Sequence, residues 1–474
     1  MSRSRLGAAV LSGVVAAQAF PPLDLGVLAW VALVPLLAAI DGVTPRQGAM
    51  LAGLQGAVFF GGLLSWIPRV VAGYGHLGWA LGLLIGGILV AVLASFHAAF
   101  GALIAWLSRF DTGMARVATP FAWVALAEWG RLWPLGGFPW GYLGYTQYRF
   151  PAMRGLAPWG GVLLLSLLIV GVNTLLFVAV RPRGGPSRRR LAAAAMACGL
   201  PVAIWLVVPA GARAEEGDGP AVRVAAVQGN VPQDEKWQAV NRRAIVSRHL
   251  DLTRKAAEGG AELILWPESS TLEPIETQTG LLGQLQEIAD AYHTAVVLGS
   301  VHRLSPVEYT NAAFLLVPGR GLVDRYDKMR LVPFGETVPL RSVLFFIGPL
   351  VQEVGSFTPG TDPKPLARAE SIGGSAPGGA AFSMAICYEV IYSPLIARQV
   401  REGSTFLATI TNDAWFGRSA APAQHFAMAV MRAAEMRRWL VRAANTGISG
   451  IITPGGEVVA RPELFETGLL RGVI

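Results

Sequence analysis

The sequence predicts an α-helical membrane domain in residues 1–210, joined to a layered α/β domain in residues 220–458. Three observations lead to this fold class. Of the 474 residues, 53% are hydrophobic and only 15% are charged, whereas soluble domains carry about 25% charged residues. Long apolar runs fill the first half of the chain. Strand and helix patterns alternate through the second half, which is typical of layered α/β domains.

The apolar runs of the first half predict about seven transmembrane helices, because one crossing takes about 20 apolar residues. The first run has an alternative interpretation, since the basic start, the apolar stretch and the small residues AQA also fit a cleaved signal peptide. We favour a retained helix. The expected spans are roughly 6–20, 25–40, 48–66, 78–105, 117–130, 159–180 and 191–209.

The charges of the first half predict the orientation of these helices. Residues 1–210 contain 14 Arg, no Lys and four acidic residues. With the N-terminus in the cytoplasm, ten of the Arg lie inside and four outside, which agrees with the positive-inside rule. Seven crossings then place the α/β domain on the outer side. The basic excess is therefore a property of membrane loops, and we expect no nucleic-acid partner.

One outer loop, residues 131–158, is unusually long and aromatic and contains Trp140. Its aromatic side chains form either an interfacial belt or a wall around a lipid or acyl-chain site.

The second half begins after a polar linker, residues 211–219. We expect helices at 239–257 and 421–440. Residues 341–358 are apolar and contain Gly and Pro, so they form either a mobile lid or a buried connection. The expected strands and hairpins are 221–231, 261–270, 294–303, 309–328, 382–390, 404–417 and 447–460.

Three residues in this half have the chemistry of a catalytic site. Cys387 ends an apolar strand, where a thiol can project into a cleft as a nucleophile, although an inert buried cysteine is the alternative. Glu268 ends another strand and is either a general base and acid or a capping residue. Lys328 is either an oxyanion-stabilising ammonium or a surface lysine of a hairpin. Glu336 could orient Lys328.

Other catalytic machinery is missing from the sequence. It contains no GxSxG, P-loop or HExxH motif, and the six His lack metal-ligand spacing. We therefore expect neither a metal nor another cofactor.

The motifs around these residues resemble the nitrilase superfamily. They are Trp266-Pro267-Glu268, Lys328 within DKMRLVPFGE, Cys387-Tyr388-Glu389, and the segments TNDAWFG and RAANTGISG. Together with the membrane domain, GGFPWGYLGYTQ at 136–147 and LVPFGETVPL at 331–340 are similar to the apolipoprotein N-acyltransferase family, and this resemblance covers nearly the whole chain.

The resemblance implies an αββα sandwich whose catalytic triad is Glu268, Lys328 and Cys387. It implies supporting roles for Glu336, Tyr388 and Glu389. We expect Trp237, Trp140 and Trp415 to line the acyl or headgroup site, although packing roles are as plausible for them. Members of the family usually return to the membrane through a C-terminal helix. Residues 459–474 contain no apolar run, so we expect a tail there.

The resemblance also implies a function. A phospholipid, with phosphatidylethanolamine as the expected acyl donor, would acylate Cys387 from its sn-1 position. The N-terminal amine of a diacylglyceryl-cysteine apolipoprotein would then accept the acyl chain. We expect a monomer in a bacterial inner membrane with its catalytic domain in the periplasm. The alternative is a membrane-tethered amidase that hydrolyses a small amide with the same triad.

Overall fold

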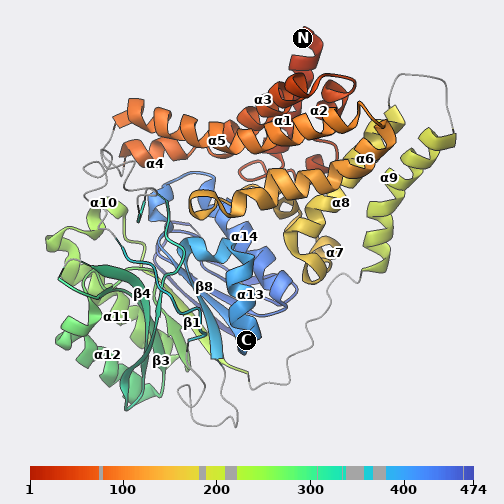
Figure 1. The fold of residues 1–474 in the computed structure, drawn as a ribbon. Coiled ribbons are helices and arrows are strands. Elements are labelled where there is room, and N and C mark those ends of the chain that lie inside the picture. The colour runs from red at the N-terminus through yellow and green to blue at the C-terminus, as the bar shows by residue number, and fades with distance from the viewer. Residues whose placement is uncertain are drawn as a thin grey trace. The chain divides into compact units, whose positions relative to one another are not determined.

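The structure is a computed structural model that describes residues 1–73, 78–180, 188–208, 221–306, 308–333, 335–337, 357–366, 381–462 and 464–474. The chain forms two compact units (Figure 1). The helical unit comprises Met1–Ala212 together with Ser419–Ala427, and the sheet unit comprises Arg213–Arg418 together with Met428–Ile474. The predicted linker 211–219 and nearly all of the predicted lid 341–358 lie outside the described residues.

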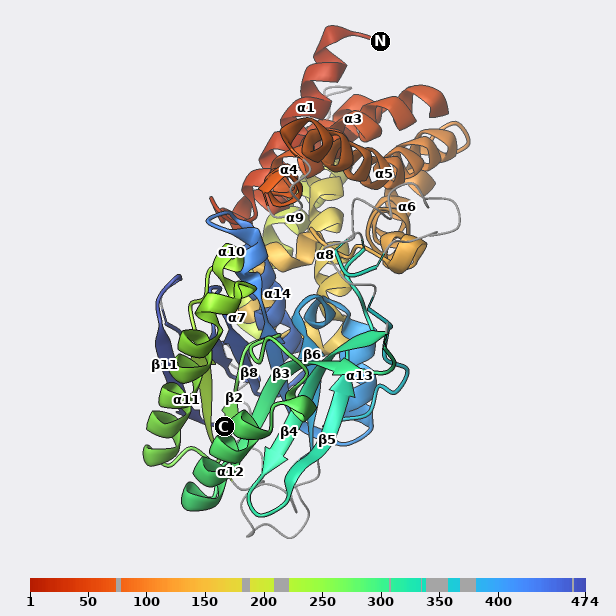
Figure 2. The ribbon, with the colours of Figure 1, turned by 90° about the vertical axis from the view of Figure 1, so that its left-hand side faces the viewer.

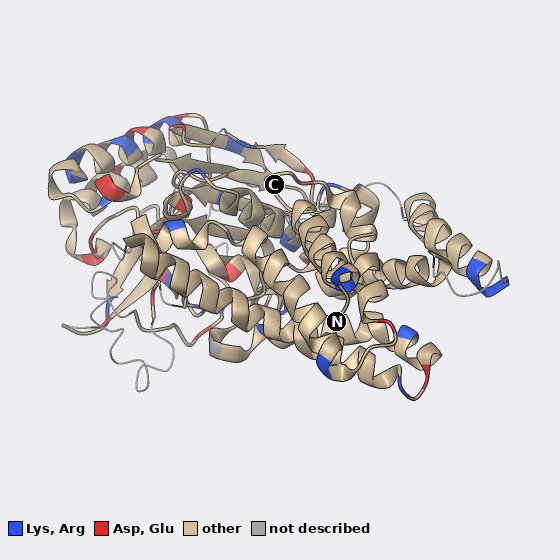
Figure 3. Ribbon diagram, turned by 90° about the horizontal axis from the view of Figure 1, so that it is seen from above, with Lys and Arg blue, Asp and Glu red and all other residues tan. Residues whose placement is uncertain are grey.

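The helical unit is built from apolar helices that carry few charged residues along their length (Figure 3). Its α-helices are α1 (Arg3–Gln18), α2 (Val34–Ile40), α3 (Pro45–Leu63), α4 (Ile67–Gly73), α5 (Gly78–Leu107), α6 (Thr112–Ala122), α7 (Pro151–Arg154), α8 (Ala157–Val180) and α9 (Arg188–Val207). Shorter 3-10 or π-helical turns are η1 (Gly26–Trp30), η2 (Trp123–Glu128), η3 (Trp129–Leu132), η4 (Pro134–Gly136) and η5 (Leu143–Gln147).

Among the described residues, three helices are long and apolar enough to cross a membrane alone: α5, α8 and α9. The helices α3 and α4 meet at a bend of 52° and count as a fourth if the pair is one span. The other predicted spans, the first, second and fifth, are shorter or broken. The second, for example, consists of the 3-10 turn η1 followed by the seven-residue α2.

Asn173 of α8 satisfies the backbone groups that this break leaves open. Its side chain donates to the carbonyl of Ala29 at 2.9 Å and accepts from the backbone N–H of Leu33 at 2.8 Å. Unpaired backbone groups are costly in hydrocarbon, and a neighbouring side chain can satisfy them.

The sheet unit contains two packed β-sheets. The six-stranded sheet has the order β11-β1-β2-β3-β4-β5 and the five-stranded sheet the order β10-β9-β8-β7-β6. The strands are β1 (Arg223–Gln228), β2 (Leu263–Leu265), β3 (Ala295–Arg303), β4 (Tyr309–Val317), β5 (Gly321–Asp327), β6 (Ala381–Ile386), β7 (Ser404–Thr411), β8 (Leu440–Ala444), β9 (Gly450–Ile452), β10 (Val458–Ala460) and β11 (Gly468–Val473).

Helices cover the outer faces of both sheets (Figure 2). The helices α11 (Arg242–Glu258) and α12 (Thr279–Tyr292) pack on the six-stranded sheet, and α13 (Ser393–Arg401) packs on β6 and β7. The core between the sheets contains aliphatic side chains from both, such as Leu265, Val297, Ile386 and Val441. The predicted αββα sandwich is therefore confirmed. The remaining helices are α10 (Gln233–Lys236) and α14 (Ala421–Met436), and the short turns are η6 (Ala239–Asn241), η7 (Ile275–Thr277), η10 (Cys387–Ile391) and η11 (Asp413–Phe416).

The topology brings the ends of several strands together. The strands β1, β2 and β3 run parallel, as do β6, β7 and β8. Carboxyl ends of parallel strands share one edge, where α/β proteins build their sites. Glu268 and Cys387 both follow such ends.

Both predicted hairpins are present, since β4 pairs with β5 and β9 pairs with β10. Residues 459–474 differ from the expected tail. β11 pairs antiparallel with β1 from Arg223↔Val473 to Gln228↔Gly468, so the segment forms the edge of the six-stranded sheet. Backbone pairing along that edge holds it there, which hydropathy alone could not reveal.

Candidate active site

Cys387 lies where strand β6 turns into the 3-10 helix η10. Its φ of 53° is in the left-handed region, which is costly for a residue with a side chain and is typically retained where the surrounding structure enforces it, often at active sites. The side chain is half-buried, whereas the five residues before it are buried. The thiol is thus presented at the end of a strand on a tightly held turn.

Glu268 follows strand β2 and its side chain is buried. Its Oε1 accepts from Nζ of Lys328 at 3.1 Å and from Nδ2 of Asn311 at 2.7 Å. Its Oε2 accepts from the backbone N–H of Asn412 at 2.8 Å. Donors from three elements therefore hold this carboxylate.

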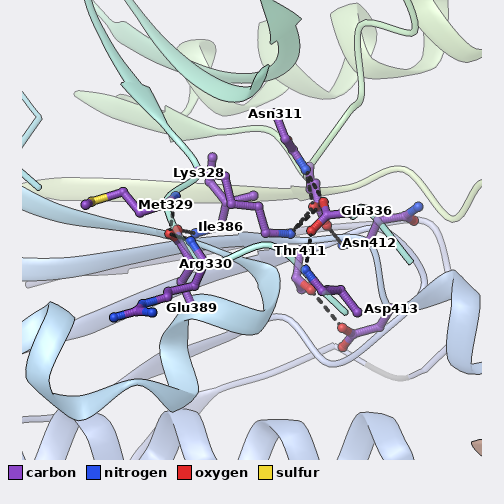
Figure 4. A network of polar contacts seen from close by, with 12 residues as sticks. Asn311, Lys328, Met329, Arg330, Glu336, Ile386, Glu389, Thr411, Asn412 and Asp413 are labelled. Atoms are coloured by element: carbon purple, nitrogen blue, oxygen red, sulfur yellow. Dashed lines mark hydrogen bonds and ion pairs between the residues drawn. The ribbon is translucent and has the colours of Figure 1, made fainter. Parts of the chain in front are cut away.

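Lys328 follows strand β5 and is also buried, so the predicted alternative of a surface lysine is wrong. Its Nζ lies 2.9 Å from Oε1 of Glu336, which the sequence predicts as its partner. Asn311 donates to the same oxygen at 2.9 Å, and the backbone N–H of Val332 donates to the other at 2.8 Å. Figure 4 shows Lys328, Glu336 and Asn311 facing one another. One ammonium thus bridges two buried carboxylates.

The charges of the three predicted triad residues follow from this arrangement. Burial opposes ionisation of Glu268, but the charge of Lys328 and hydrogen bonds from Asn311 and Lys328 hold the pKa of Glu268 below its usual value. Burial alone would lower the pKa of Lys328, but Glu268 and Glu336 raise it. Burial raises the pKa of the Cys387 thiol, and the charge of Glu268 raises it further. The resting site therefore holds a carboxylate, an ammonium and a neutral thiol.

Glu389 connects the segments on which Lys328 and Cys387 lie. It is fully buried. Its Oε1 accepts from the backbone N–H groups of Met329 and Arg330 at 2.7 and 3.0 Å, and its Oε2 accepts from that of Ile386 at 2.8 Å (Figure 4). The carboxylate therefore ties the residues after Lys328 to the residue before Cys387.

The other predicted site residues differ in burial and in the elements that carry them. Tyr388 is buried, with its ring 5.4 Å from that of Tyr392. Trp237 follows α10 and is half exposed, at 52%. Trp415 lies in η11. Trp140 belongs to the helical unit, is buried, and donates to the side chain of Gln424 at 2.8 Å. For all three Trp, a substrate contact stays a prediction.

Sequence reasoning missed three groups at the site: Asn311 and Asn412, described above, and Lys236. Nζ of Lys236 donates to the backbone carbonyl of Glu268 at 3.1 Å. The chain contains only four Lys, and this scarcity is the one sequence signal that could have drawn attention to Lys236.

Among the described residues, no group of three or more His, Cys, Asp or Glu could hold a metal ion. A carboxylate that can accept a thiol proton, beside an ammonium that can stabilise an oxyanion, provides the parts of nucleophilic acyl transfer.

Comparison with known proteins matches both the helical unit and the sheet unit to families. Residues 12–175 match the apolipoprotein N-acyltransferase N-terminal domain, and residues 223–474 match the carbon-nitrogen hydrolase family. An apolipoprotein N-acyltransferase of Geobacter metallireducens is 37% identical over 98% of this chain and 88% of its own length. One of Pseudomonas aeruginosa is 33% identical over 98% of this chain and 89% of its own length. A solved amidase of the nitrilase superfamily from Nesterenkonia is 19% identical, with a TM-score of 0.41 over 54% of this chain and 93% of that one.

Proposed function

This chain belongs to the apolipoprotein N-acyltransferase family, and we propose that it moves an acyl chain from the sn-1 position of a phospholipid to the N-terminal amine of a lipoprotein through a thioester on Cys387. The observation that carries the proposal is a thiol on a strained strand end beside a buried Glu268–Lys328 pair. Helices long and apolar enough to cross a membrane, on the same chain, favour a lipid as acyl donor.

In the first half-reaction, Sγ of Cys387 attacks the carbonyl carbon of the ester while Glu268 takes the thiol proton. Lys328 stabilises the oxyanion of the tetrahedral intermediate, because its ammonium is fixed in place before the charge develops. The carbon–oxygen bond then breaks, and Glu268 returns the proton to the alkoxide. The products are a lysophospholipid and the thioester.

In the second half-reaction, the neutral α-amine of a diacylglyceryl-cysteine attacks the thioester. The carbon–nitrogen bond forms and the carbon–sulfur bond breaks. Glu268 takes one proton from the nitrogen and delivers it to the thiolate. The two half-reactions share one base and one nucleophile, so the scheme is ping-pong.

We further assign the chain to a bacterial inner membrane, with the sheet unit on the periplasmic side, phosphatidylethanolamine as the donor and a monomer as the active form. The distribution of Arg in residues 1–210 supports this orientation. A single chain contains all the residues that the scheme uses, which supports a monomer.

The test uses the purified full-length protein and a phospholipid labelled in its sn-1 acyl chain. We expect a protein-bound label that hydroxylamine releases and that moves to a diacylglyceryl lipopeptide when one is added. Cys387→Ala should acquire no label, whereas the matched control Cys198→Ala should behave as the wild type. Label on neither protein, with hydrolysis of small amides instead, would replace this proposal with the membrane-tethered amidase.

A further inference from the structure

A second lysine is buried in the sheet unit. Lys236 ends the short helix α10 and is only 3% exposed. Its Nζ donates to the backbone carbonyl of Glu268 at 3.1 Å, on the residue whose side chain holds Lys328. A buried ammonium is expensive unless charges or hydrogen bonds compensate it. An aliphatic residue would fill the same space without that cost, so the ammonium itself needs an explanation.

The remaining surroundings of Lys236 include a small cavity with both polar and apolar lining residues. It is lined by Lys236, His249, Glu268, Ser270 and Asn445 among others. The volume that the centre of a water molecule can occupy in it is about 10 Å³. That is close to the room that one ordered water needs. The cavity thus has space for a single bridging molecule beside the ammonium.

His249 of α11 provides an acceptor at this cavity. Its Nδ1 lies 2.8 Å from the backbone carbonyl of Ile245, so Nδ1 carries the proton and Nε2 is an acceptor. Nε2 is buried and has no hydrogen-bond partner among the described residues. Burial lowers the pKa of His249 to about 4, so the ring is neutral at physiological pH. A water that accepts from Lys236 and donates to Nε2 would satisfy both groups.

The residue after strand β1 keeps this space available. A Cβ on Gly229 would lie 2.4 Å from Cε1 and 2.5 Å from Nε2 of His249. Atoms do not approach so closely, so only a glycine at this position allows the ring to reach the cavity. The local structure is therefore arranged around an uncharged acceptor near Lys236.

The charges of the site give Lys236 a function. Lys328 is bonded to two carboxylates, Glu268 and Glu336, so these three groups together carry one net negative charge. Lys236 brings the total of these four groups to zero. When the proton of Cys387 moves to Glu268, the new negative charge passes to the oxyanion and the total stays at zero. Without Lys236 that charge would form in a buried site that is already negative.

The electrostatics of Lys236 are consistent with a position close to Glu268 and Cys387. Burial lowers the pKa of Lys236 to about 8, against the charges of Glu268 and of a Cys387 thiolate, which raise it. The charge of Lys236 likewise contributes to lowering the pKa of Glu268.

We propose that Lys236 is a second cationic positioning residue of the active site, which fixes the backbone of Glu268 and offsets negative charge at Cys387, held in turn by one buried water on Nε2 of His249. The proposal rests on the proposed function for its reaction, but the charge effect on Cys387 does not depend on the acyl donor.

The experiment compares Lys236→Met, Lys236→Arg and the matched control Lys255→Met, an exposed lysine of α11, in the full-length detergent-solubilised protein. The first readout is the rate at which iodoacetamide alkylates Cys387 between about pH 6 and pH 9. The second is single-turnover formation of the acyl-enzyme from labelled phospholipid, with kcat and KM determined separately.

We expect Lys236→Met to slow both alkylation and acyl-enzyme formation by about tenfold or more, the equivalent of one pKa unit, and to change KM little. Lys236→Arg should recover most of the rate, because it keeps the charge, and Lys255→Met should match the wild type. His249→Leu and Gly229→Ala should lower the rate in the same direction but less. If Lys236→Met does not fold, Lys236→Gln and His249→Leu provide the same readings.

Two results would overturn the proposal. The first is alkylation of Cys387 in Lys236→Met at the wild-type rate. The second is an equal loss of turnover in Lys236→Arg and Lys236→Met with unchanged alkylation rates, since that result indicates packing alone. If the wild type itself forms no acyl-enzyme, the proposed function fails. The alkylation rates then still decide the role of Lys236.

Discussion

Gly299 of strand β3 is the position at which one added methyl group tests the geometry of the site most directly. A Cβ built there would lie 2.1 Å from the carbonyl oxygen of Pro267 and 2.7 Å from Cα of Glu268. Both are backbone atoms, which cannot rotate away. Ordinary contact begins at about 3.4 Å, so Cα of Glu268 must move by about 3.4 − 2.7 = 0.7 Å, and the Pro267 carbonyl by more.

We therefore expect Gly299→Ala to displace the carboxylate of Glu268 from Lys328 and Cys387. A misplacement of about 1 Å at a reacting group can cost about 100-fold in rate. The crowding itself should destabilise the sheet unit by about 1–3 kcal/mol. The matched control is Gly283→Ala on α12, where a Cβ meets nothing within 4 Å. That change should stabilise the protein by about 0.5–1 kcal/mol.

The assay is single-turnover acyl-enzyme formation from labelled phospholipid, together with urea unfolding of both variants. We expect a loss of roughly 30- to 300-fold for Gly299→Ala and wild-type rates for Gly283→Ala. A Gly299→Ala protein that is folded and forms the acyl-enzyme within about twofold of the wild type would refute the claim that this contact sets the position of Glu268.

Three further predictions concern charge and the helical unit. Burial raises the pKa of Glu389 to about 7, so its contribution to stability is complete below about pH 4.5 and is lost as the pH rises through 7. Glu389→Gln should therefore remove about 3 kcal/mol from the difference in urea unfolding free energy between low and neutral pH. Because the pKa of Glu268 is held below its usual value, the rate of acyl-enzyme formation in the wild type should fall little between about pH 7 and pH 5. A pH–rate profile whose midpoint lies within that range would contradict this expectation. Gln424 bonds the indoles of Trp66 and Trp140 and the carbonyls of Pro21 and Leu63. Gln424→Leu should lower the free energy of unfolding by about 2–3 kcal/mol, at about 0.6 kcal/mol for each hydrogen bond lost within a membrane. An unchanged midpoint of thermal unfolding would contradict this prediction.

Features that depend on local sequence could be predicted. The Pro318-Gly319 turn fixes the β4–β5 hairpin, which carries Lys328 at its end. The apolar run before Cys387 specifies a buried strand, and the change to polar residues marks its end. The pairing of Glu268 with Lys328 could be expected only from the resemblance of their motifs to the nitrilase superfamily, because each residue taken alone also fits a role outside a site.

Features that depend on long-range contacts could not be predicted. β11 has no hydrophobic pattern strong enough to mark it, and its place follows from pairing with β1, more than 200 residues away. The broken spans of the helical unit need Asn173 on a distant helix to satisfy their backbone groups. Lys236 belongs to a residue type that usually lies on the surface, and its burial beside the Glu268 carbonyl shows a role that the scarcity of lysine alone did not specify.

The two sheets contribute different parts of the site, and this explains why so many of its hydrogen bonds involve backbone groups. Glu268 and Lys328 follow strands of the six-stranded sheet, whereas Cys387 follows a strand of the other. Side-chain packing between sheets tolerates small shifts, but a base and a nucleophile do not. Glu389 bonds backbone N–H groups on both sides, and Glu268 itself accepts from the backbone of Asn412 after β7. Backbone groups have no rotamers, and both carboxylates are buried, so these bonds add directional links between the two sheets that apolar packing does not provide.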